Sequence, residues 1–306
     1  MKNDLISVAD LTPEQITGLL DLALELKSKL KQGRAEPLLE GKTLAMIFEK
    51  PSLRTRVTFD VGMAQLGGHA VYLGPNQIQL GKRESVADVA RNLGRWVDAV
   101  MARTFSHQTI VELARNVEIP VINGLSDLEH PCQVLATALS LREKRDSLDG
   151  LNVVFVGDGN NVANSLMLLC PRLGMNFVIA CPEGYEPNRE LTEQARLFAQ
   201  RRGTTIHILH DPYQAVKGAD LIYTDVWASM GQEAEAEKRR KVFGPYQVNG
   251  RLLESAKPGC LVSHCLPAHR GEEITDEVLD GLSCMALDEA ENRLHIQKAI
   301  LVSLMR

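Results

Sequence analysis

A short stretch near the start of the chain carries the residue types that bind an oxyanion. It reads Ser52-Leu53-Arg54-Thr55-Arg56 and follows a short apolar run at 43–48. The run predicts a buried strand, and the helical spacing after Pro51 predicts a helix that Ser52 caps and Gly67-Gly68 ends. A helix start offers unpaired N–H groups and partial positive charge, and this stretch adds a guanidinium and two hydroxyls. It therefore predicts a site for a phosphate or another oxyanion.

The two arginines of this stretch are two positions apart, so on a helix they point to nearly opposite sides. At most one of them can hold the anion, and we assign that role to Arg54. The alternative interpretation, a capped helix whose arginines both lie on the surface, stays open at this point.

The composition is typical of a globular chain with enough residues for two domains. Of its 306 residues, 44% are apolar and 24% are charged. The net charge of −5 and the pI near 5.9 argue against nucleic acid or an anionic membrane as the main partner. No apolar run approaches the length of a membrane span, and the first residues lack the pattern of a signal peptide. Six cysteines without paired spacing indicate the reduced thiols of a cytoplasmic protein.

Apolar runs alternate with helical patterns along the whole chain. The expected strands lie at 43–48, 69–73, 99–103, 119–122, 152–156, 176–180, 205–208, 219–224, 260–263 and 285–287. Alternation of this kind predicts parallel sheets, and the polar break at 146–150 predicts a domain boundary. We therefore expect an α/β protein with two doubly wound parallel-sheet domains in series. The apolar helix at 293–304 is expected to be buried rather than a free tail.

The residues best suited to chemistry follow the expected strands. They lie at 52–55, 103, 130–133, 157–161, 225–232 and 264–270. Ligands of open α/β sheets collect at the carboxyl ends of the strands. Six such placements predict a ligand cleft between the two domains.

Two motifs have competing interpretations. Gly157-Asp158-Gly159, with Glu183 beyond the next strand, resembles the start of a dinucleotide fingerprint, but the third glycine is missing, and a plain strand-to-helix turn explains it as well. The histidines and the cysteine of 264–270 could suggest a metal site or a Cys-His nucleophile. No carboxylate has a spacing that completes a metal set, and His264 and Cys265 point to opposite faces of an extended segment. We expect no metal here.

The charged run at 233–241 favours a short solvated helix over a binding patch. Its acidic residues come first and its basic residues last, which suits the helix dipole. Glu235 with Arg239, and Glu237 with Lys241, have the spacing of surface ion pairs. Cys132 is expected in the core.

Four blocks together resemble the aspartate/ornithine carbamoyltransferase family. They are Ser52-Leu53-Arg54-Thr55-Arg56, His130-Pro131-Cys132-Gln133, Asp225-Val226-Trp227-Ala228-Ser229-Met230-Gly231 and His264-Cys265-Leu266-Pro267. They occur in the family's order over nearly the whole chain, and the last two blocks resemble the branch that uses ornithine rather than aspartate. Leu53 departs from the family, in which threonine is commoner; its N–H can still reach a phosphate, but a hydroxyl contact is lost.

The resemblance implies transfer of the carbamoyl group of carbamoyl phosphate to the side-chain amine of L-ornithine, giving L-citrulline and phosphate. It implies a carbamoyl phosphate-binding domain at 1–146, completed by a C-terminal helix at 289–306, and an ornithine-binding domain at 147–288. It implies no metal and no organic cofactor, since phosphate is a good leaving group. It also implies a homotrimer or a multiple of one.

The resemblance also assigns the site residues. The implied carbamoyl phosphate ligands are Ser52, Leu53, Arg54, Thr55, Arg103, His130, Gln133, Cys265, Leu266 and Arg293, with Gln79, in a polar loop at 75–82, from a neighbouring subunit. The implied ornithine ligands are Asn161, Asp225, Ser229 and Met230. Catalysis is assigned to Arg54, Arg103, His130, Asp225 and Cys265.

Three alternatives differ from this assignment. Another carbamoyltransferase of the same family would use putrescine, an acylated ornithine or aspartate as the acceptor. An NAD-dependent dehydrogenase is suggested only by Gly157 and Gly159. A non-catalytic phosphate-binding module would use the anion site without chemistry, which the number of polar groups at the strand ends disfavours.

Overall fold

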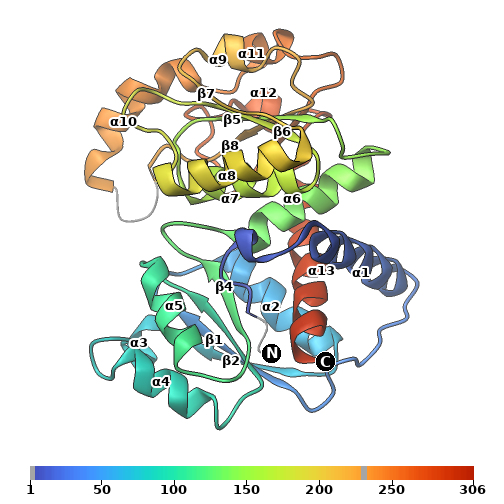
Figure 1. Cartoon of the computed structure of the whole chain (residues 1–306), viewed down its shortest axis with the longest axis vertical. Helices are drawn as coiled ribbons and strands as arrows, with labels where there is room; N and C mark the ends of the chain where they lie inside the picture. Colours follow the sequence, from blue (N-terminus) through green and yellow to red (C-terminus); the bar gives the residue numbers. More distant parts are fainter. Residues whose placement is uncertain (1–3, 229–232) are drawn as a thin grey trace. The chain divides into compact units, whose positions relative to one another are not determined.

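A parallel sheet forms the centre of each of two units in the computed structural model, which describes residues 4–228 and 233–306 (Figure 1). Unit 1 comprises the chain up to Leu139 together with Glu291–Arg306, and unit 2 comprises Ser140–Ala290. Two helices, α6 (Pro131–Lys144) and α13 (Ala286–Met305), carry the chain from one unit to the other.

The sheet of unit 1 has four parallel strands in the order β2-β1-β3-β4. Their bounds are β1 Thr43–Phe48, β2 His69–Leu73, β3 Ala99–Arg103 and β4 Val121–Leu125. The first three match their predicted ranges, but the range 119–122 for the fourth was wrong. Asn123 resembles a loop residue, yet its N–H donates to the Leu5 carbonyl at 2.8 Å and its side-chain amide to the Ile6 carbonyl at 2.8 Å. Pairing with the N-terminal segment therefore extends the strand through a polar residue.

Helices cover both faces of this sheet (Figure 1). The helices before α6 are α1 Pro13–Lys31, α2 Leu53–Gln65, α3 Pro75–Ile78, α4 Val86–Leu93 and α5 His107–Arg115, with a short 3-10 helix at Val8–Asp10. Apolar residues of α4 and α5 pack on one face of β1, β3 and β4. The predicted side-chain cap Ser52 is confirmed, and Thr12 and Ser85 cap α1 and α4 in the same way. The polar loop expected at 75–82 contains the helix α3, which Pro75 begins.

The C-terminal helix α13 packs on unit 1, as the sequence predicted. A Cβ placed on Gly62 of α2 would lie 3.4 Å from the Lys298 side chain and 3.7 Å from Leu294. Lys298 also donates to the Gln65 side chain at 3.0 Å. The helix begins at Ala286, before the predicted residue 293, and it is buried along most of its length.

A buried lysine of α1 contacts α13. Lys27 donates to the Asn292 side chain at 2.8 Å and lies 3.5 Å from the Glu291 carboxylate. His295 is 2% exposed and lies 3.6 Å from Glu291. Burial lowers the pKa of His295 to about 4, and the positive charges of Lys27 and Lys298 act in the same direction, while Glu291 opposes them. His295 is therefore neutral near pH 7.

This burial predicts an acid-sensitive fold. The unfolded chain binds a proton on His295 near pH 6.5, whereas the folded chain does so only near pH 4. Between these two pH values the unfolded state therefore binds more protons than the folded state. The free energy of unfolding consequently decreases as the pH falls through this range. Between pH 7 and 4.5 we expect the wild type to lose about 2 kcal/mol more unfolding free energy than His295→Gln. Denaturant unfolding at several pH values tests this; the exposed His207→Gln control should follow the wild type, and parallel curves for all three would contradict it.

The sheet of unit 2 has five parallel strands in the order β7-β6-β5-β8-β9. Their bounds are β5 Asn152–Val156, β6 Asn176–Ala180, β7 Ile206–Leu209, β8 Leu221–Thr224 and β9 Leu261–His264. The strand predicted at 285–287 was wrong, because α13 begins at Ala286. Just before it, the Met285 N–H donates to the Val262 carbonyl at 2.8 Å, and the Val262 N–H donates to the Ser283 carbonyl at 2.9 Å. The segment therefore forms one isolated bridge beside β9, between Val262 and Cys284, before the helix begins.

Helices lie on both faces of this sheet as well (Figure 1). They are α7 Asn161–Arg172, α8 Arg189–Arg202, α9 Pro212–Ala215, α10 Ala236–Phe243, α11 Gly250–Glu254 and α12 Asp276–Leu279, with 3-10 helices at Glu233–Glu235 and Gly244–Tyr246. Apolar residues around α9, α11 and α12 pack on one face. Both units are therefore doubly wound α/β domains, as predicted.

The helix α10 is not the solvated helix that the sequence predicted. Arg239 is 6% exposed and donates to the Asp158 carboxylate at 2.9 Å and to the Trp227 carbonyl at 2.8 Å. Its guanidinium also lies 5.0 Å from the centre of the Tyr185 ring. The expected pairing of Arg239 with Glu235 does form, at 3.2 Å. Arg239 thus ties α10 to the loops that follow β5 and β8.

The loss of Arg239 should destabilise the fold. Burial raises the pKa of Asp158, and the guanidinium opposes that effect, so Arg239→Met would leave a buried carboxyl group without its cation. We expect the apparent Tm to fall by roughly 5–10 °C. The matched control is Arg240→Met, which removes an exposed pair with Glu272 and should change the Tm by less than about 3 °C. Equal Tm shifts of the two variants in differential scanning fluorimetry would contradict a buried structural role for Arg239.

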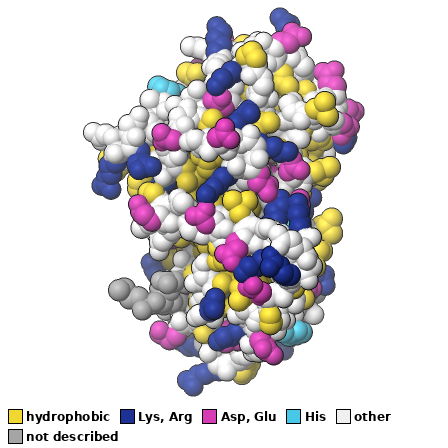
Figure 2. Space-filling view, turned by 90° about the vertical axis from the view of Figure 1, so that its right-hand side faces the viewer, with side chains coloured by type: hydrophobic (Ala, Val, Ile, Leu, Met, Phe, Trp, Pro, Cys, Tyr) yellow, Lys and Arg dark blue, Asp and Glu magenta, His cyan; other side chains and the backbone are white. Residues whose placement is uncertain are grey.

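On the face shown in Figure 2, basic and acidic side chains are interspersed, in agreement with the small net charge. Within residues 4–228 and 233–306, no helix combines the length and the apolarity that crossing a membrane requires.

Candidate functional site

The topology of each sheet explains where its polar residues gather. In unit 1 the chain proceeds from β1 outward to β2, then returns to β3 and proceeds to β4 on the other side. In unit 2 it proceeds from β5 to β6 and β7, then returns to β8 and β9. The direction of winding reverses between β1 and β3 and between β5 and β8, and loops diverge there to leave a crevice at the carboxyl ends of the strands. The predicted site residues follow these strands.

The helix start at Ser52 has the geometry of an anion site. Ser52 is extended at φ −160°, and its hydroxyl accepts the Thr55 N–H at 3.2 Å. This leaves other N–H groups of the first turn to a ligand. No acidic side chain occupies this turn. This local geometry suits the predicted phosphate site, which stays a prediction.

Arg103 reaches the same edge of the sheet from β3. The register between β3 and β4 shifts after Ala102, so that Arg103 pairs with Leu125 and Gly124 is left as a bulge. A Cβ on Gly124 would lie 2.4 Å from the Met101 sulfur, which explains a glycine there. Bulges redirect nearby side chains, and they are common beside active sites. Arg103 is 7% exposed.

A fully buried arginine connects α13 to this site. Arg293 donates to the Thr55 hydroxyl at 3.1 Å and to the Gln133 side-chain carbonyl. Thr55, Gln133 and Arg293 are each at most 2% exposed. The three residues come from α2, α6 and α13, so this contact depends on the docking of the C-terminal helix.

His130 precedes α6 and is neutral in this environment. It is 4% exposed. Burial lowers the pKa of His130 well below its ordinary value, and the positive charges of Arg293, Arg103 and Arg54 lower it further. These guanidinium groups therefore act on one imidazole, and together with the α2 start they define the unit 1 site. A neutral imidazole offers one N–H donor and one acceptor, and it adds no further positive charge to the buried Arg103 and Arg293.

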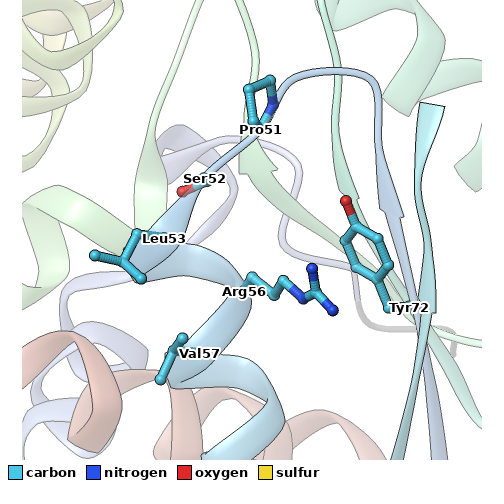
Figure 3. Close-up of a pocket in the computed structure, with 6 residues that line it drawn as sticks. All are labelled: Pro51, Ser52, Leu53, Arg56, Val57 and Tyr72. Carbon is cyan, nitrogen blue, oxygen red and sulfur yellow. The ribbon is translucent and has the colours of Figure 1, made fainter. Parts of the chain in front are cut away.

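Leu53 and Arg56 lie beside the unit 1 site, on a surface of α2. With Pro51, Ser52, Val57 and Tyr72 they line a shallow pocket (Figure 3). Arg56 points to the Tyr72 ring, with its guanidinium carbon 3.8 Å from the ring centre, while Leu53 points away and is 74% exposed. Arg56 therefore has a packing role, and the Leu53 side chain faces solvent.

Gln79 lies apart from these residues. It is exposed in the loop after α3 and has a left-handed backbone at φ 46°. A non-glycine residue in this conformation is strained by roughly 1–2 kcal/mol, and such strain clusters at functional loops.

In unit 2 the order of the strands brings Asp225 to Cys265. β8 and β9 are neighbours, and Thr224 pairs with His264, so the next residue of each strand emerges side by side. The Cys265 thiol donates to the Asp225 carboxylate at 2.8 Å. The other carboxylate oxygen accepts the Asn160 side-chain amide at 2.7 Å. These residues define the unit 2 site.

Asn160 lies in the predicted stretch 157–161, but the sequence assigned it no role. It caps α7 by accepting the N–H groups of Val162 and Ala163, while its amide fixes Asp225. The predicted residue Asn161 is the first helical residue after it. The available signal was an asparagine directly before a helical pattern. Ser229 and Met230 lie outside the described residues.

His264 and Glu273 support the turn at Cys265 and Leu266, and the sequence gave no indication of the role of Glu273. His264 accepts the Leu266 N–H on Nδ1 at 2.8 Å, so its Nε2 carries the proton and faces Glu273 at 3.0 Å. Both His264 and Glu273 are fully buried. Leu266 itself has φ 57°, a left-handed conformation that this arrangement holds. His264 and Cys265 thus have different partners, which agrees with the predicted absence of a direct Cys-His pair.

The second glycine of the dinucleotide-like motif, Gly159, allows another part of this chain to approach. A Cβ on Gly159 would lie 2.3 Å from the Pro187 nitrogen and 2.4 Å from the Glu186 carbonyl carbon. In a dinucleotide fingerprint this glycine lets the backbone approach a pyrophosphate. Here the 186–187 backbone makes that close approach, which favours the interpretation as a strand-to-helix turn.

Among residues 4–228 and 233–306, two groups of side chains have the composition of metal sites. They are Asp225, His264 and Cys265, and His269, Glu272 and Glu273, each with ligand atoms within 4.8 Å of one another. No carboxylate has a spacing in the sequence that would join His264, but the adjacent ends of β8 and β9 bring Asp225 to it. The prediction that the reaction uses no metal concerns chemistry and stays a prediction.

Comparisons with known proteins match both units. Residues 3–143 match the family model described as aspartate/ornithine carbamoyltransferase, carbamoyl-P binding domain, and residues 149–304 match its Asp/Orn binding domain. A curated relative from Pyrococcus abyssi, ornithine carbamoyltransferase, is 55% identical over 99% of this chain and 95% of its own length. A relative from Pyrococcus furiosus, ornithine carbamoyltransferase, anabolic, is 54% identical over 99% and 96%.

Solved structures agree with these relatives. The structure of ornithine carbamoyltransferase from Pyrococcus furiosus has a TM-score of 0.97 and 54% identity, covering 99% of this chain and 97% of that chain. The enzyme of that name from Thermus thermophilus has a TM-score of 0.90 and 45% identity, with full coverage of both chains.

Proposed function

Because this chain belongs to the aspartate/ornithine carbamoyltransferase family, we infer that it transfers the carbamoyl group of carbamoyl phosphate to the side-chain amine of L-ornithine, giving L-citrulline and phosphate. The observation that carries this conclusion is identity above 50% to ornithine carbamoyltransferases over 99% of the chain. We assign carbamoyl phosphate to unit 1 and ornithine to unit 2, and the family models, which describe a carbamoyl-P binding domain and an Asp/Orn binding domain, support this assignment.

In the proposed mechanism, the unit 1 site holds the phosphate of carbamoyl phosphate. The N–H groups of the α2 start, the Ser52 hydroxyl and the Arg54 guanidinium supply donors and positive charge. The Leu53 N–H contributes through the backbone, so its exposed side chain is not needed. Gln133 holds the carbamoyl amide, and Arg293 orients both Gln133 and Thr55.

Stabilising the carbonyl oxygen is the largest catalytic contribution that we assign to unit 1. The amine nitrogen bonds to the carbonyl carbon, the bond from that carbon to the phosphate oxygen breaks, and phosphate leaves with the electron pair and takes up the proton that the nitrogen loses. Negative charge develops on the carbonyl oxygen meanwhile. Thr55, Arg103 and neutral His130 are the proposed donors to it, and buried donors of this kind act strongly because little reorganisation is needed.

The attacking amine must be neutral. A free amine of pKa ~10 costs roughly 4–5 kcal/mol to deprotonate at pH 7. Asp225, already oriented by Asn160 and Cys265, is the proposed group that binds this amine and directs its lone pair. The Leu266 carbonyl, presented by the His264-supported turn, is the second acceptor. Ser229, Met230 and Asn161 are proposed for the α-amino and α-carboxylate groups of ornithine.

We propose a homotrimer as the working assembly. Leu53, Val57 and Val61 form an exposed apolar stripe along α2, with 74%, 47% and 38% of their surfaces exposed. The stripe borders the phosphate-binding turn, and a neighbouring subunit that covers it would bring Gln79 to the phosphate. Light scattering after gel filtration should give three times 33.8 kDa, or a multiple of that trimer; a monomer of full activity would overturn this assignment.

The six cysteines, none of them in a disulfide, support a cytoplasmic location.

Citrulline formation from purified protein tests the function directly. Carbamoyl phosphate is supplied with ornithine, putrescine, N-acetylornithine or aspartate, and kcat/KM is compared. We expect ornithine to exceed each other acceptor by at least about a hundredfold, because a site that pairs charged groups rejects substrates lacking them. A preference for another acceptor would reassign the substrate, and no carbamoylated product from any acceptor would refute the function.

A further inference from the structure

The turn that follows the unit 2 site gathers three metal-binding side chains of its own. His269, Glu272 and Glu273 each place one ligand atom within 4.8 Å of the others. The His269 side chain is 53% exposed and the Glu272 side chain 32% exposed, whereas Glu273 is fully buried. A ligand could therefore approach from solvent and contact a buried carboxylate.

The buried carboxylate has one unsatisfied oxygen that faces this cluster. Oε1 of Glu273 accepts the His264 ring N–H at 3.0 Å and the His269 backbone N–H at 2.6 Å. Oε2 is buried without a hydrogen-bond partner among residues 4–228 and 233–306. The His269 Nδ1 atom lies 3.9 Å away, which is too far for a hydrogen bond. An unsatisfied buried carboxylate oxygen is costly, and a cation at this position would satisfy it.

The backbone of the turn is held by hydrogen bonds. Glu272 N–H donates to the His269 carbonyl at 2.8 Å, and Gly271 N–H to the Ile274 carbonyl at 2.9 Å. The Gln247 side chain donates to the Gly271 and Glu272 carbonyls, both at 2.9 Å. The ligand-bearing residues therefore sit on a fixed backbone, and only two exposed side chains need to adjust.

We propose that His269, Glu272 and Glu273 bind a divalent transition-metal cation, such as Zn²⁺, with water completing the coordination. One imidazole and two carboxylates suit zinc, whose bonds of about 2.0–2.2 Å place tetrahedral ligands about 3.4 Å apart. The 3.9 Å between His269 Nδ1 and Glu273 Oε2 needs a contraction of only about half an ångström. Glu272 accepts from the Arg240 side chain through one oxygen, which leaves the other for the ion.

The neighbouring cluster of Asp225, His264 and Cys265 is the competing position for an ion. There, both ring nitrogens of His264 already have partners, and the Cys265 thiol donates to Asp225. An ion at that cluster would have to break these bonds, whereas an ion at His269 leaves them intact. This difference favours the His269 cluster.

Cobalt binding to the full chain distinguishes the two clusters. After dialysis against a chelator, Co²⁺ is titrated by visible absorption and Zn²⁺ by calorimetry. We expect one equivalent per chain, no thiolate-to-cobalt band in the near ultraviolet, and unchanged affinity in Cys265→Ser. His269→Ala and Glu272→Gln should each weaken binding at least about tenfold, and His207→Gln, at another exposed histidine, should not.

Three results would overturn the proposal. A thiolate band that Cys265→Ser abolishes would place the ion at Asp225 and Cys265. Equal affinity in the wild type and His269→Ala would show an adventitious ion only. No saturable binding below about 1 mM would show that His269 and Glu273 form an ion pair and nothing more. The readout is metal affinity, so the outcome does not depend on carbamoyl transfer.

Discussion

Replacing Arg54 by alanine is expected to lower kcat/KM for carbamoyl phosphate by about a thousandfold. Arg54 is the second residue of α2, so its guanidinium adds a full charge to the N–H groups that Ser52 leaves available. Its charge also helps to keep His130 neutral, so one substitution affects both phosphate binding and the carbonyl donor. Losing a single preorganised donor costs roughly 10²–10³ in rate, and losing a phosphate ligand with it adds to that.

Arg56→Ala is the matched control. It removes the same group from the same helix, two residues later, but this guanidinium packs on the Tyr72 ring. We expect its kcat/KM to change by less than about tenfold, with some loss of stability. Steady-state kinetics with both substrates varied, together with Tm values, separate the two. Similar kinetic losses in both variants would refute the assignment of the phosphate to Arg54.

Replacing Asp225 by asparagine is expected to lower kcat/KM for ornithine at least about a hundredfold and to leave the KM for carbamoyl phosphate nearly unchanged. The carboxylate accepts from Asn160, Cys265 and the Val226 N–H, and an amide can accept on only one of its two atoms. The substrate amine also loses the negative charge that orients it. A hundredfold loss corresponds to about 2.7 kcal/mol of transition-state stabilisation.

Asp220→Asn is the control for structural damage. Asp220 directly precedes β8, at the end opposite Asp225, and is similarly buried at 5% exposure. It accepts from the Asn152 N–H and the Lys257 side chain, so its substitution also disturbs buried hydrogen bonds. We expect a comparable fall in Tm and an unchanged kcat/KM. If Asp220→Asn lost activity to the same degree, the effect of Asp225→Asn would be one of stability.

Local signals in the sequence determined most of the secondary structure. The strands at 43–48, 69–73, 99–103, 152–156 and 176–180 have the predicted bounds, because each is a run of apolar residues between clear breaks. The cap at Ser52 depends on a hydrogen bond within four residues of the chain, so it too could be predicted. Two misplaced strands, at 119–122 and 285–287, depended on partners far along the chain.

In the candidate site, too, local features could be predicted, whereas contacts between distant residues could not. The sequence identified polar residues after the strands and, through the family's motifs, their ligands. It gave no sign of Asn160 as the partner of Asp225, of Glu273 beneath His264, or of Arg239 as a buried cation. Arg239 has the spacing of a surface ion pair, and only the packing of α10 on the loop at Asp158 buries it.

The sequence by itself determined which groups are present and which end of each strand they follow, since caps, apolar runs and motif spacing are short-range. The tertiary structure decided which of these groups meet. Asp225 and Cys265 are 40 positions apart and become hydrogen-bonded because β8 and β9 pair in parallel. Thr55 and Arg293 are 238 positions apart and meet because α13 packs on α2. Sheet order and helix docking depend on burying apolar surface over the whole chain, and no local pattern encodes them.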